Sequence, residues 1–465
     1  MPKTRAGDGS RWPLALMAVG IVVLGIAGLR LARDGDGAAV VPDVGALASC
    51  DVGGCKANAD LRPVRGYAVP SLVADADDAD HLIVTDVNLV GGVCGWHVTF
   101  DGGRTWEDGV FPLPSGYKNC QLDSAGFLSA GNVAWGPSGA VYSVLSSAPV
   151  DDRGARTQGE SVLLVRSDDG GRTFDPARVV VPGGPVGMSF LRPRVSVVAG
   201  PGGVDRLLVS FWECDEDRCP RVHFAQSLDG GATFASPVLL SHDPGGNSPS
   251  APVVDADGAV HVLFLRRYDD GPVDLVHARS SDGGTTFTNT TLDRQQLTGR
   301  DYDSPRLAVA PDGRTLYAVA SDNRQGRPDV YFRHSDDGGD TWGQAALLSD
   351  RSSGGAFLPD VSVSPQGRID VVYYERSREN VDQVMWAHSF DGGATFERQL
   401  QLNDGSIDRD IGYAYEVGDS YGPEVVSTSG TALVVWSDSR LGTVETDTQD
   451  TVLRRVEIRE RSAPG

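Results

Sequence analysis

The sequence predicts an all-β fold, a β-propeller of six or seven four-stranded blades, preceded by one N-terminal transmembrane helix. An eight-residue motif recurs six times, its aspartates lie 53 to 68 residues apart, and each copy sits between segments that alternate between strand and tight-turn patterns. Periods of this length indicate a stack or ring of similar supersecondary units. Closing such units into a ring protects the edges of the sheets, which favours a propeller.

The N-terminal segment is predicted to cross a membrane. Residues 12–29 carry no charge, and these 18 residues would span about 27 Å as a helix, close to the thickness of a bilayer's hydrocarbon core. Three basic residues precede the segment, Lys3, Arg5 and Arg11. The positive-inside rule therefore keeps residues 1–11 in the cytoplasm and makes residues 12–33 a single-pass signal anchor in the cell membrane. The alternative is a cleaved signal peptide and a secreted protein.

Both readings place the rest of the chain outside the cytoplasm, with a linker at residues 34–60 and the propeller at residues 61–460.

Six cysteines in an exported chain favour disulfides, and the economical pairs are Cys50–Cys55, Cys94–Cys120 and Cys214–Cys219. Zinc bound by the two C-x4-C pairs is the rival, which this spacing and an oxidising compartment disfavour. We expect neither a metal nor a cofactor.

The net charge limits the classes of partner that the protein can bind. With a formal charge of −22, the protein would repel a polyanion over most of its surface, so nucleic acid is not an expected partner.

Each copy of the motif is predicted to form a hairpin turn. The clearest copies read TFDGGRTW at 99–106 and SDDGGRTF at 167–174. The carboxylate satisfies loop amides, glycine takes positive φ, and the last aromatic residue returns to the apolar layer between sheets. One carboxylate per loop is too few for calcium. The aspartates with this structural role are Asp101, Asp169, Asp229, Asp282, Asp337 and Asp391.

The same strand series surrounds each motif. In residues 305–350, RLAVA, LYAVAS, DVYFRHS and WGQAALLS read as strands A to D, and the motif is the C–D turn. Seven A–B hairpins occur with only six motifs, because the final segment supplies A, B and C alone. Seven blades are therefore favoured over six. The outer strand of the last blade is expected to come from residues 61–69.

The motif resembles the Asp box, or BNR repeat, of bacterial sialidases and their relatives, over roughly residues 65–460. The resemblance implies a sialidase-like β-propeller whose boxes lie on the face away from any active site. One departure from the family is visible in the sequence. Where sialidases carry F/Y-R-I-P near the first blade, this chain reads GYAVPS at 66–71, with no arginine.

A ligand is expected at the channel mouth on the face opposite the boxes. The A strands begin there with equivalent residues, namely Ser71, Asn132, Arg194, Ala251, Arg306, Asp360 and Glu424. Guanidinium groups can grip a carboxylate, and tyrosines can stack on a sugar ring. The ligand-binding candidates are Arg194, Arg306, Arg324 and Asn132. The alternative interpretation is that repeated polar residues of this kind form ion pairs between blades.

Two functions are compatible with this pattern. The first is a membrane-anchored module that binds a glycan or protein at the propeller mouth without chemistry. The second is a retaining exo-glycosidase of the sialidase type (exo-alpha-sialidase), for which the resemblance implies an arginine cluster, a tyrosine nucleophile assisted by glutamate, and an aspartic acid as general acid. The catalytic candidates are Tyr415 or Tyr421, with Glu416 or Glu424, and Asp360 as the acid.

Overall fold

The computed structural model describes residues 48–51, 54–56, 67–88, 93–117, 131–215, 219–241, 246–268, 273–295, 305–350, 354–377, 381–397, 399–405, 407–408, 422–439 and 450–458. Within these ranges the helical content is a single 3-10 turn, η1 (Pro201–Gly203), and no helix is long and apolar enough to cross a membrane. The predicted anchor at 12–29 lies outside the described residues.

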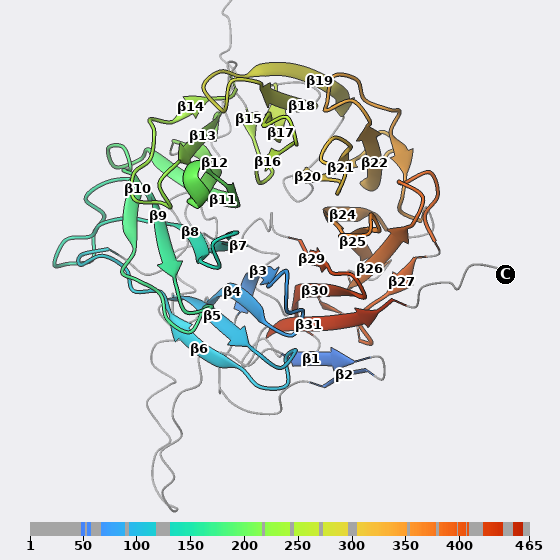
Figure 1. The fold of residues 1–465 in the computed structure, drawn as a ribbon, viewed down its shortest axis with the longest axis horizontal. Coiled ribbons are helices and arrows are strands. Elements are labelled where there is room, and N and C mark those ends of the chain that lie inside the picture. The colour runs from blue at the N-terminus through green and yellow to red at the C-terminus, as the bar shows by residue number, and fades with distance from the viewer. Residues whose placement is uncertain are drawn as a thin grey trace, which may run out of the picture. The chain divides into compact units, whose positions relative to one another are not determined.

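Seven sheets stand radially around a central channel, which confirms the seven-bladed propeller (Figure 1). From the channel outward, blade 1 contains β3 (Tyr67–Ala74), β4 (Leu82–Asn88), β5 (Val93–Thr99) and β6 (Glu107–Val110). Blade 2 contains β7 (Asn132–Trp135), β8 (Val141–Ser147), β9 (Ser161–Ser167) and β10 (Arg178–Val181). Blade 3 contains β11 (Ser189–Ala199), β12 (Asp205–Cys214), β13 (Arg221–Ser227) and β14 (Val238–Leu239).

The next three blades follow the same plan. Blade 4 contains β15 (Gly246–Asn247) and β16 (Val253–Val254), which both pair with β17 (Val260–Arg267), then β18 (Val273–Ser280) and β19 (Thr288–Gln295). Blade 5 contains β20 (Arg306–Val309), β21 (Leu316–Asp322), β22 (Asp329–Ser335) and β23 (Ala346–Leu347). Blade 6 contains β24 (Ala356–Val363), β25 (Ile369–Arg376) and β26 (Val381–Ser389), with β27 (Leu400–Gln401) and β28 (Ile407–Asp408) both on β26.

Blade 7 closes the ring with strands from both ends of the described chain. Its inner strands are β29 (Glu424–Ser427), β30 (Thr431–Asp438) and β31 (Asp450–Glu457). Outside them lie β1 (Ala48–Asp51), parallel to β31, and then β2 (Gly54–Lys56). The prediction that residues 61–69 donate this outer strand is wrong. Tyr67 begins β3, which pairs with β4 as the inner strand of blade 1, so the donor is the earlier segment β1.

The disulfide prediction is confirmed where the described residues test it. Cys214 and Cys219 are bonded and close the loop between β12 and β13. Cys94 is also disulfide-bonded, while its predicted partner, Cys120, lies outside the described residues. The register of β1 and β2 places Cys50 opposite Cys55. The bonds Cys50–Cys55 and Cys94–Cys120 stay predictions.

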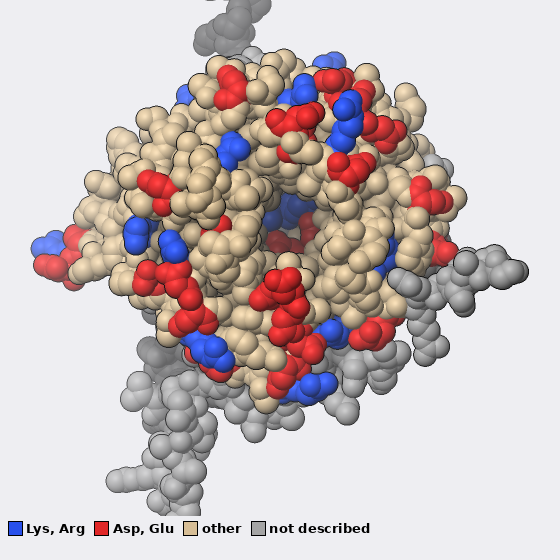
Figure 2. Space-filling view, in the orientation of Figure 1, with Lys and Arg blue, Asp and Glu red and all other residues tan. Residues whose placement is uncertain are grey.

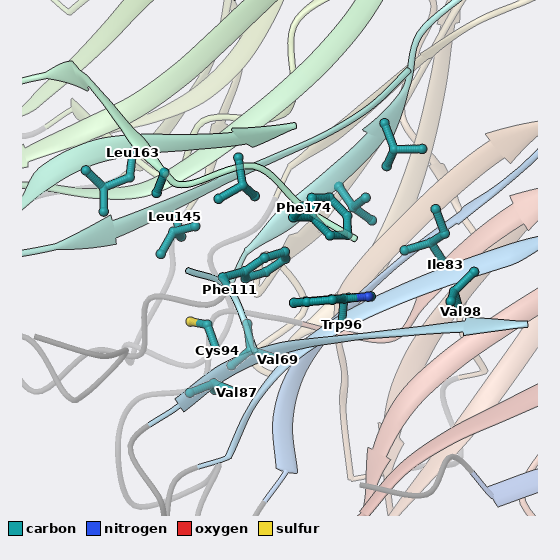
Figure 3. Packing of buried hydrophobic residues seen from close by; sticks show 14 of the residues in the cluster. Val69, Ile83, Val87, Cys94, Trp96, Val98, Phe111, Leu145, Leu163 and Phe174 are labelled. Carbon is teal, nitrogen blue, oxygen red and sulfur yellow. The ribbon is translucent and has the colours of Figure 1, made fainter. Parts of the chain in front are cut away.

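Apolar layers between adjacent blades form the core. Middle strands such as β4 and β8 are buried along their whole length, because each sheet is covered on both faces. Between blades 1 and 2, Trp96, Phe111 and Phe174 gather in one aromatic cluster with ring centroids 4.9–5.4 Å apart (Figure 3). Phe174 is the last residue of the second motif, so its predicted return to the interblade layer is confirmed.

The six turns also have the predicted internal geometry. In the third motif, Asp229 accepts hydrogen bonds from the amide of Thr233 at 2.9 Å and from its hydroxyl at 2.5 Å, and the glycines at 230 and 231 have φ of 69° and 84°. The bond from the threonine amide recurs in all six motifs at 2.8–2.9 Å. The hydroxyl of Thr233 stabilises the charged carboxylate and lowers the pKa of Asp229 to about 2.

Candidate functional site

The residues predicted at equivalent positions of the inner strands lie around the channel, and four of them form hydrogen bonds to a neighbouring blade. Each accepts a hydrogen bond from the next blade's inner strand. The amide of Val133 donates to Ser71 Oγ at 3.3 Å, and the amide of Val195 donates to Asn132 Oδ1 at 2.8 Å. The amide of Val425 donates to Asp360 Oδ2 at 2.9 Å, and the amide of Leu72 donates to Glu424 Oε2 at 3.2 Å. These four positions therefore have an architectural role.

The two arginines of the ring interact differently, because a guanidinium cannot accept such a bond. Arg194 Nη1 of blade 3 lies 3.3 Å from Glu424 Oε1 of blade 7. Arg306 Nε of blade 5 lies 3.4 Å from Asp360 Oδ1 of blade 6. All four side chains are at least 85% buried, so two cations and two carboxylates share a water-poor channel.

The charges of this channel quartet, Arg194, Arg306, Asp360 and Glu424, act on one another. Burial raises the pKa of Asp360, the charges of Arg306 and Arg194 oppose the shift, the charge of Glu424 adds to it, and the resulting pKa is about 6. A carboxyl of this kind can hold a proton near neutral pH. In the space-filling view, basic and acidic side chains are visible deep in the central hollow (Figure 2).

A repeated backbone feature positions the ring residues. Four residues that directly precede a proline have φ between 50° and 61°, namely Val69, Arg192, Ser248 and Leu358. At three of them the strand register shifts just before the ring residue. Positive φ is costly for residues with a side chain, so the surrounding structure must enforce it. The feature recurs in blades 1, 3, 4 and 6, so it belongs to the architecture of the ring and is not specific to one site.

The remaining candidates do not join the quartet among the described residues. Arg324 lies at the seam between blades 4 and 5, where it pairs with Asp293 at 2.5 Å and with Asp322 and covers the ring of Tyr331. The catalytic candidates Tyr415, Glu416 and Tyr421 lie outside the described residues. No cluster of three or more His, Cys, Asp or Glu side chains within the described ranges could hold a metal ion.

Sequence reasoning missed a buried histidine at the seam between blades 1 and 7. His97 Nδ1 lies 2.5 Å from Asp108 and its Nε2 lies 3.1 Å from Asp86. Thr451 of blade 7 donates to the same carboxylate of Asp86 at 2.7 Å. Burial opposes a charged imidazole here, but the two aspartates outweigh it and raise the pKa of His97 to about 10. No motif marks the cluster, because its members come from four different strands.

Comparisons with known proteins agree with this architecture. Residues 146–371 match the family model of the BNR repeat-like domain. The six boxes, the seven blades and this match define an Asp-box β-propeller. A search of curated proteins finds no match to the sequence.

Three solved structures are similar to this chain at low sequence identity. A Hadza microbial sialidase is 15% identical, with 81% of this chain and 73% of that chain covered and a TM-score of 0.46. The Trypanosoma rangeli sialidase in complex with the inhibitor DANA is 12% identical, with 75% and 58% covered and a TM-score of 0.45. An ulvan lyase is 12% identical, with 85% and 94% covered and a TM-score of 0.48.

Proposed function

We propose that the protein is a membrane-anchored extracytoplasmic binding module that takes a glycan or protein ligand at the channel mouth. The observation that carries the proposal is the convergence of Arg194 and Arg306 on the two carboxylates of the channel quartet. A ligand carboxylate can replace Asp360 or Glu424 as the partner of a guanidinium, since these groups bind carboxylates with good geometry. Anchoring would come from residues 12–33, which keep the propeller outside the cytoplasm.

The carboxylates of the quartet support binding over chemistry. Asp360 and Glu424 each hold a backbone amide of the next blade, so both carry a structural role that a reacting group would have to give up. A pair of carboxylates beside two arginines also leaves the mouth close to neutral. A polyhydroxylated ligand with a single carboxylate matches this balance better than a polyanion.

The second candidate is a retaining exo-glycosidase of the sialidase type. It is favoured by the buried carboxyl of Asp360, whose pKa is raised to about 6, because a general acid must hold its proton near the working pH. In this reading Tyr415 or Tyr421, with Glu416 or Glu424, would supply the nucleophile.

Binding and turnover can be separated with the full-length chain in detergent. Titration with 3′-sialyllactose and with lactose compares the same sugar with and without a carboxylate. We expect tighter binding of the carboxylated sugar, and about a tenfold loss in Arg306→Ala, corresponding to about 1.4 kcal/mol. Arg294→Ala is the matched control, since Arg294 pairs with Asp274 at the exposed rim. Equal affinity for the two sugars would contradict carboxylate recognition.

A fluorogenic sialoside tests the second candidate. Turnover that disappears in Tyr415→Phe or Tyr421→Phe, with the sugar still bound, would establish the hydrolase. Binding without turnover would leave the module as the function.

A further inference from the structure

On the box face, each box seats against the preceding blade. The contact is made by the second glycine of the box, which has positive φ and no side chain. A Cβ at Gly231 of the third box would lie 2.5 Å from Leu164 of blade 2, and one at Gly393 of the sixth box would lie 2.4 Å from Phe332 of blade 5. We call the surface of a blade that receives the box of the next blade a seat. The ring therefore has one seat on every blade that is followed by a box.

The seat on blade 1 holds an arginine. Arg172 of the second box lies over the ring of Phe100, with 3.8 Å between the guanidinium carbon and the ring centroid. Its Nε also lies 3.7 Å from Glu107 Oε2. Phe100 and Glu107 are the second and ninth residues counted from the start of the first box. A flat guanidinium stacked on an aromatic face beside a carboxylate is a favourable arrangement.

The sixth box repeats this pair of residues. Phe390 and Glu397 occupy its second and ninth positions, and among the six boxes this combination occurs only in the first and the sixth. The sequence contains no seventh box, and the outer edge of β31 pairs with β1 instead. Blade 6 is thus the blade that carries the phenylalanine and glutamate without a following box to supply an arginine.

A pocket of about 520 Å³ lies at this place, between the box of blade 6 and the end of β31. Phe390, Asp391 and Glu397 line the pocket together with Gln366 and Ile458. Phe390 is 53% exposed, an unusual state for a phenylalanine in the described part of the chain. The volume is within the range of ordinary ligand sites.

The charges around the pocket favour a cation. Arg368 also lines it, but this side chain is buried and turned inward, with Nε donating to Asp370 at 2.9 Å and Nη2 donating to the carbonyl of Thr431 at 2.8 Å. Thr395 bonds to Asp391 and lowers the pKa of this exposed carboxyl to about 2, so it stays ionised. With Arg368 neutralised by Asp370, the ionised carboxylate of Asp391 contributes a negative charge to the pocket.

We propose that this pocket on the box face of blade 6 binds a guanidinium group, the side chain of an arginine that a partner protein presents on a tight turn. The occupant is argued from the molecule itself, since the equivalent seat on blade 1 is filled by an arginine on a Gly-Gly turn. The site lies on the opposite face from the channel quartet and does not depend on the function proposed there.

The test uses the full-length protein and two cyclised peptides. One peptide carries the sequence of the second box, SDDGGRTF, and the other replaces its arginine with alanine, as in the third and sixth boxes. Titration followed by calorimetry or by NMR shifts is expected to show binding of the arginine peptide and at least about tenfold weaker binding of the alanine peptide.

Variants at Phe390 and at the equivalent position of another box show where the peptide binds. Phe390→Ala is expected to abolish the preference for arginine, and Phe390→Leu, which keeps the bulk but not the aromatic ring, to weaken it. Leu228→Ala is the control, because Leu228 has the same position in the third box and the same 53% exposure, and it should leave binding unchanged. Equal binding of both peptides, or binding unaffected by Phe390→Ala, would overturn the proposal.

A further arm distinguishes the source of the arginine. The chain continues past Ile458 with Arg459 and Arg461. If the peptide binds only after both are changed to alanine, the chain's own arginines take the site and a partner protein is not the occupant.

Discussion

The two faces of the propeller satisfy their polar groups in different ways. In a box, the aspartate and the first serine or threonine bond to groups no more than four residues away. At the channel mouth, the residues joined by hydrogen bonds are 61 to 352 positions apart, as for Asn132 with Ser71 and Leu72 with Glu424. The box therefore stabilises one hairpin, whereas the mouth joins one blade to the next.

This difference separates local structure from ring closure. A box can form as soon as its two strands meet, since closing a short loop costs little entropy. The bonds between Glu424 and blade 1, and between Thr451 and Asp86, can form only when the first and last blades come together. Variants of the long-range contacts should act on the whole propeller, and variants of the boxes should act on one turn.

The largest expected effect is at the closing seam. Asp86→Ala removes one of the two carboxylates around buried His97 and the acceptor of Thr451, and breaking a buried charge pair costs about 3–5 kcal/mol. Urea unfolding followed by tryptophan fluorescence measures the loss. Asp80→Ala is the control, because Asp80 pairs with Arg455 across the same seam but is half exposed, and such pairs contribute about 0–1 kcal/mol. Equal losses in the two variants would refute the assignment.

The same histidine predicts how stability depends on pH. The folded pKa of His97 is about 10, above its ordinary value of 6.5, so the folded state holds the proton more tightly than the unfolded chain. The stability from this proton is complete below about pH 6.5 and is lost as the pH rises through 10. The melting temperature should therefore fall between pH 7 and 10, and fall less steeply in His97→Asn. Parallel pH profiles of the two proteins would contradict this.

A smaller effect is expected at the channel mouth. Asp360→Ala leaves the amide of Val425 without its acceptor, and an unsatisfied buried amide costs about 1–3 kcal/mol. Asp360→Asn keeps an acceptor oxygen and removes the charge, so thermal unfolding should show a clearly smaller loss. If asparagine were as damaging as alanine, the ion pair with Arg306 would be the dominant contribution and the amide bond a minor one.

The contrast between local contacts in the boxes and long-range contacts between blades also explains which features could be predicted from the sequence. The boxes were predictable in detail, because the carboxylate, the glycines and the aromatic residue that form each turn lie within eight residues. The ring residues were predictable by position, since Arg194, Arg306, Asp360 and Glu424 align from blade to blade. The hydrogen bonds that Asp360 and Glu424 accept from amides of the next blade were not predictable. The donor of the outer strand of blade 7 was predicted wrongly and the His97 cluster was missed. Both depend on pairings between segments far apart in the chain, which local patterns do not encode.

Within one box, the buried serine and the exposed aspartate are expected to contribute differently to stability. Ser227 is buried and accepts from the amide of Gly231 at 2.9 Å, so Ser227→Ala should cost about 1–3 kcal/mol. Asp229 lies at the surface, where water can replace the carboxylate for the amide of Thr233, and Asp229→Asn should lower the melting temperature less. Because the folded pKa of Asp229 is about 2, its contribution is present above about pH 4 and is lost as the pH falls through 2. The difference between Asp229→Asn and the wild type should therefore vanish in acid, while that of Ser227→Ala persists. A serine variant that recovers its stability in acid would show that the aspartate, not the serine, holds the turn.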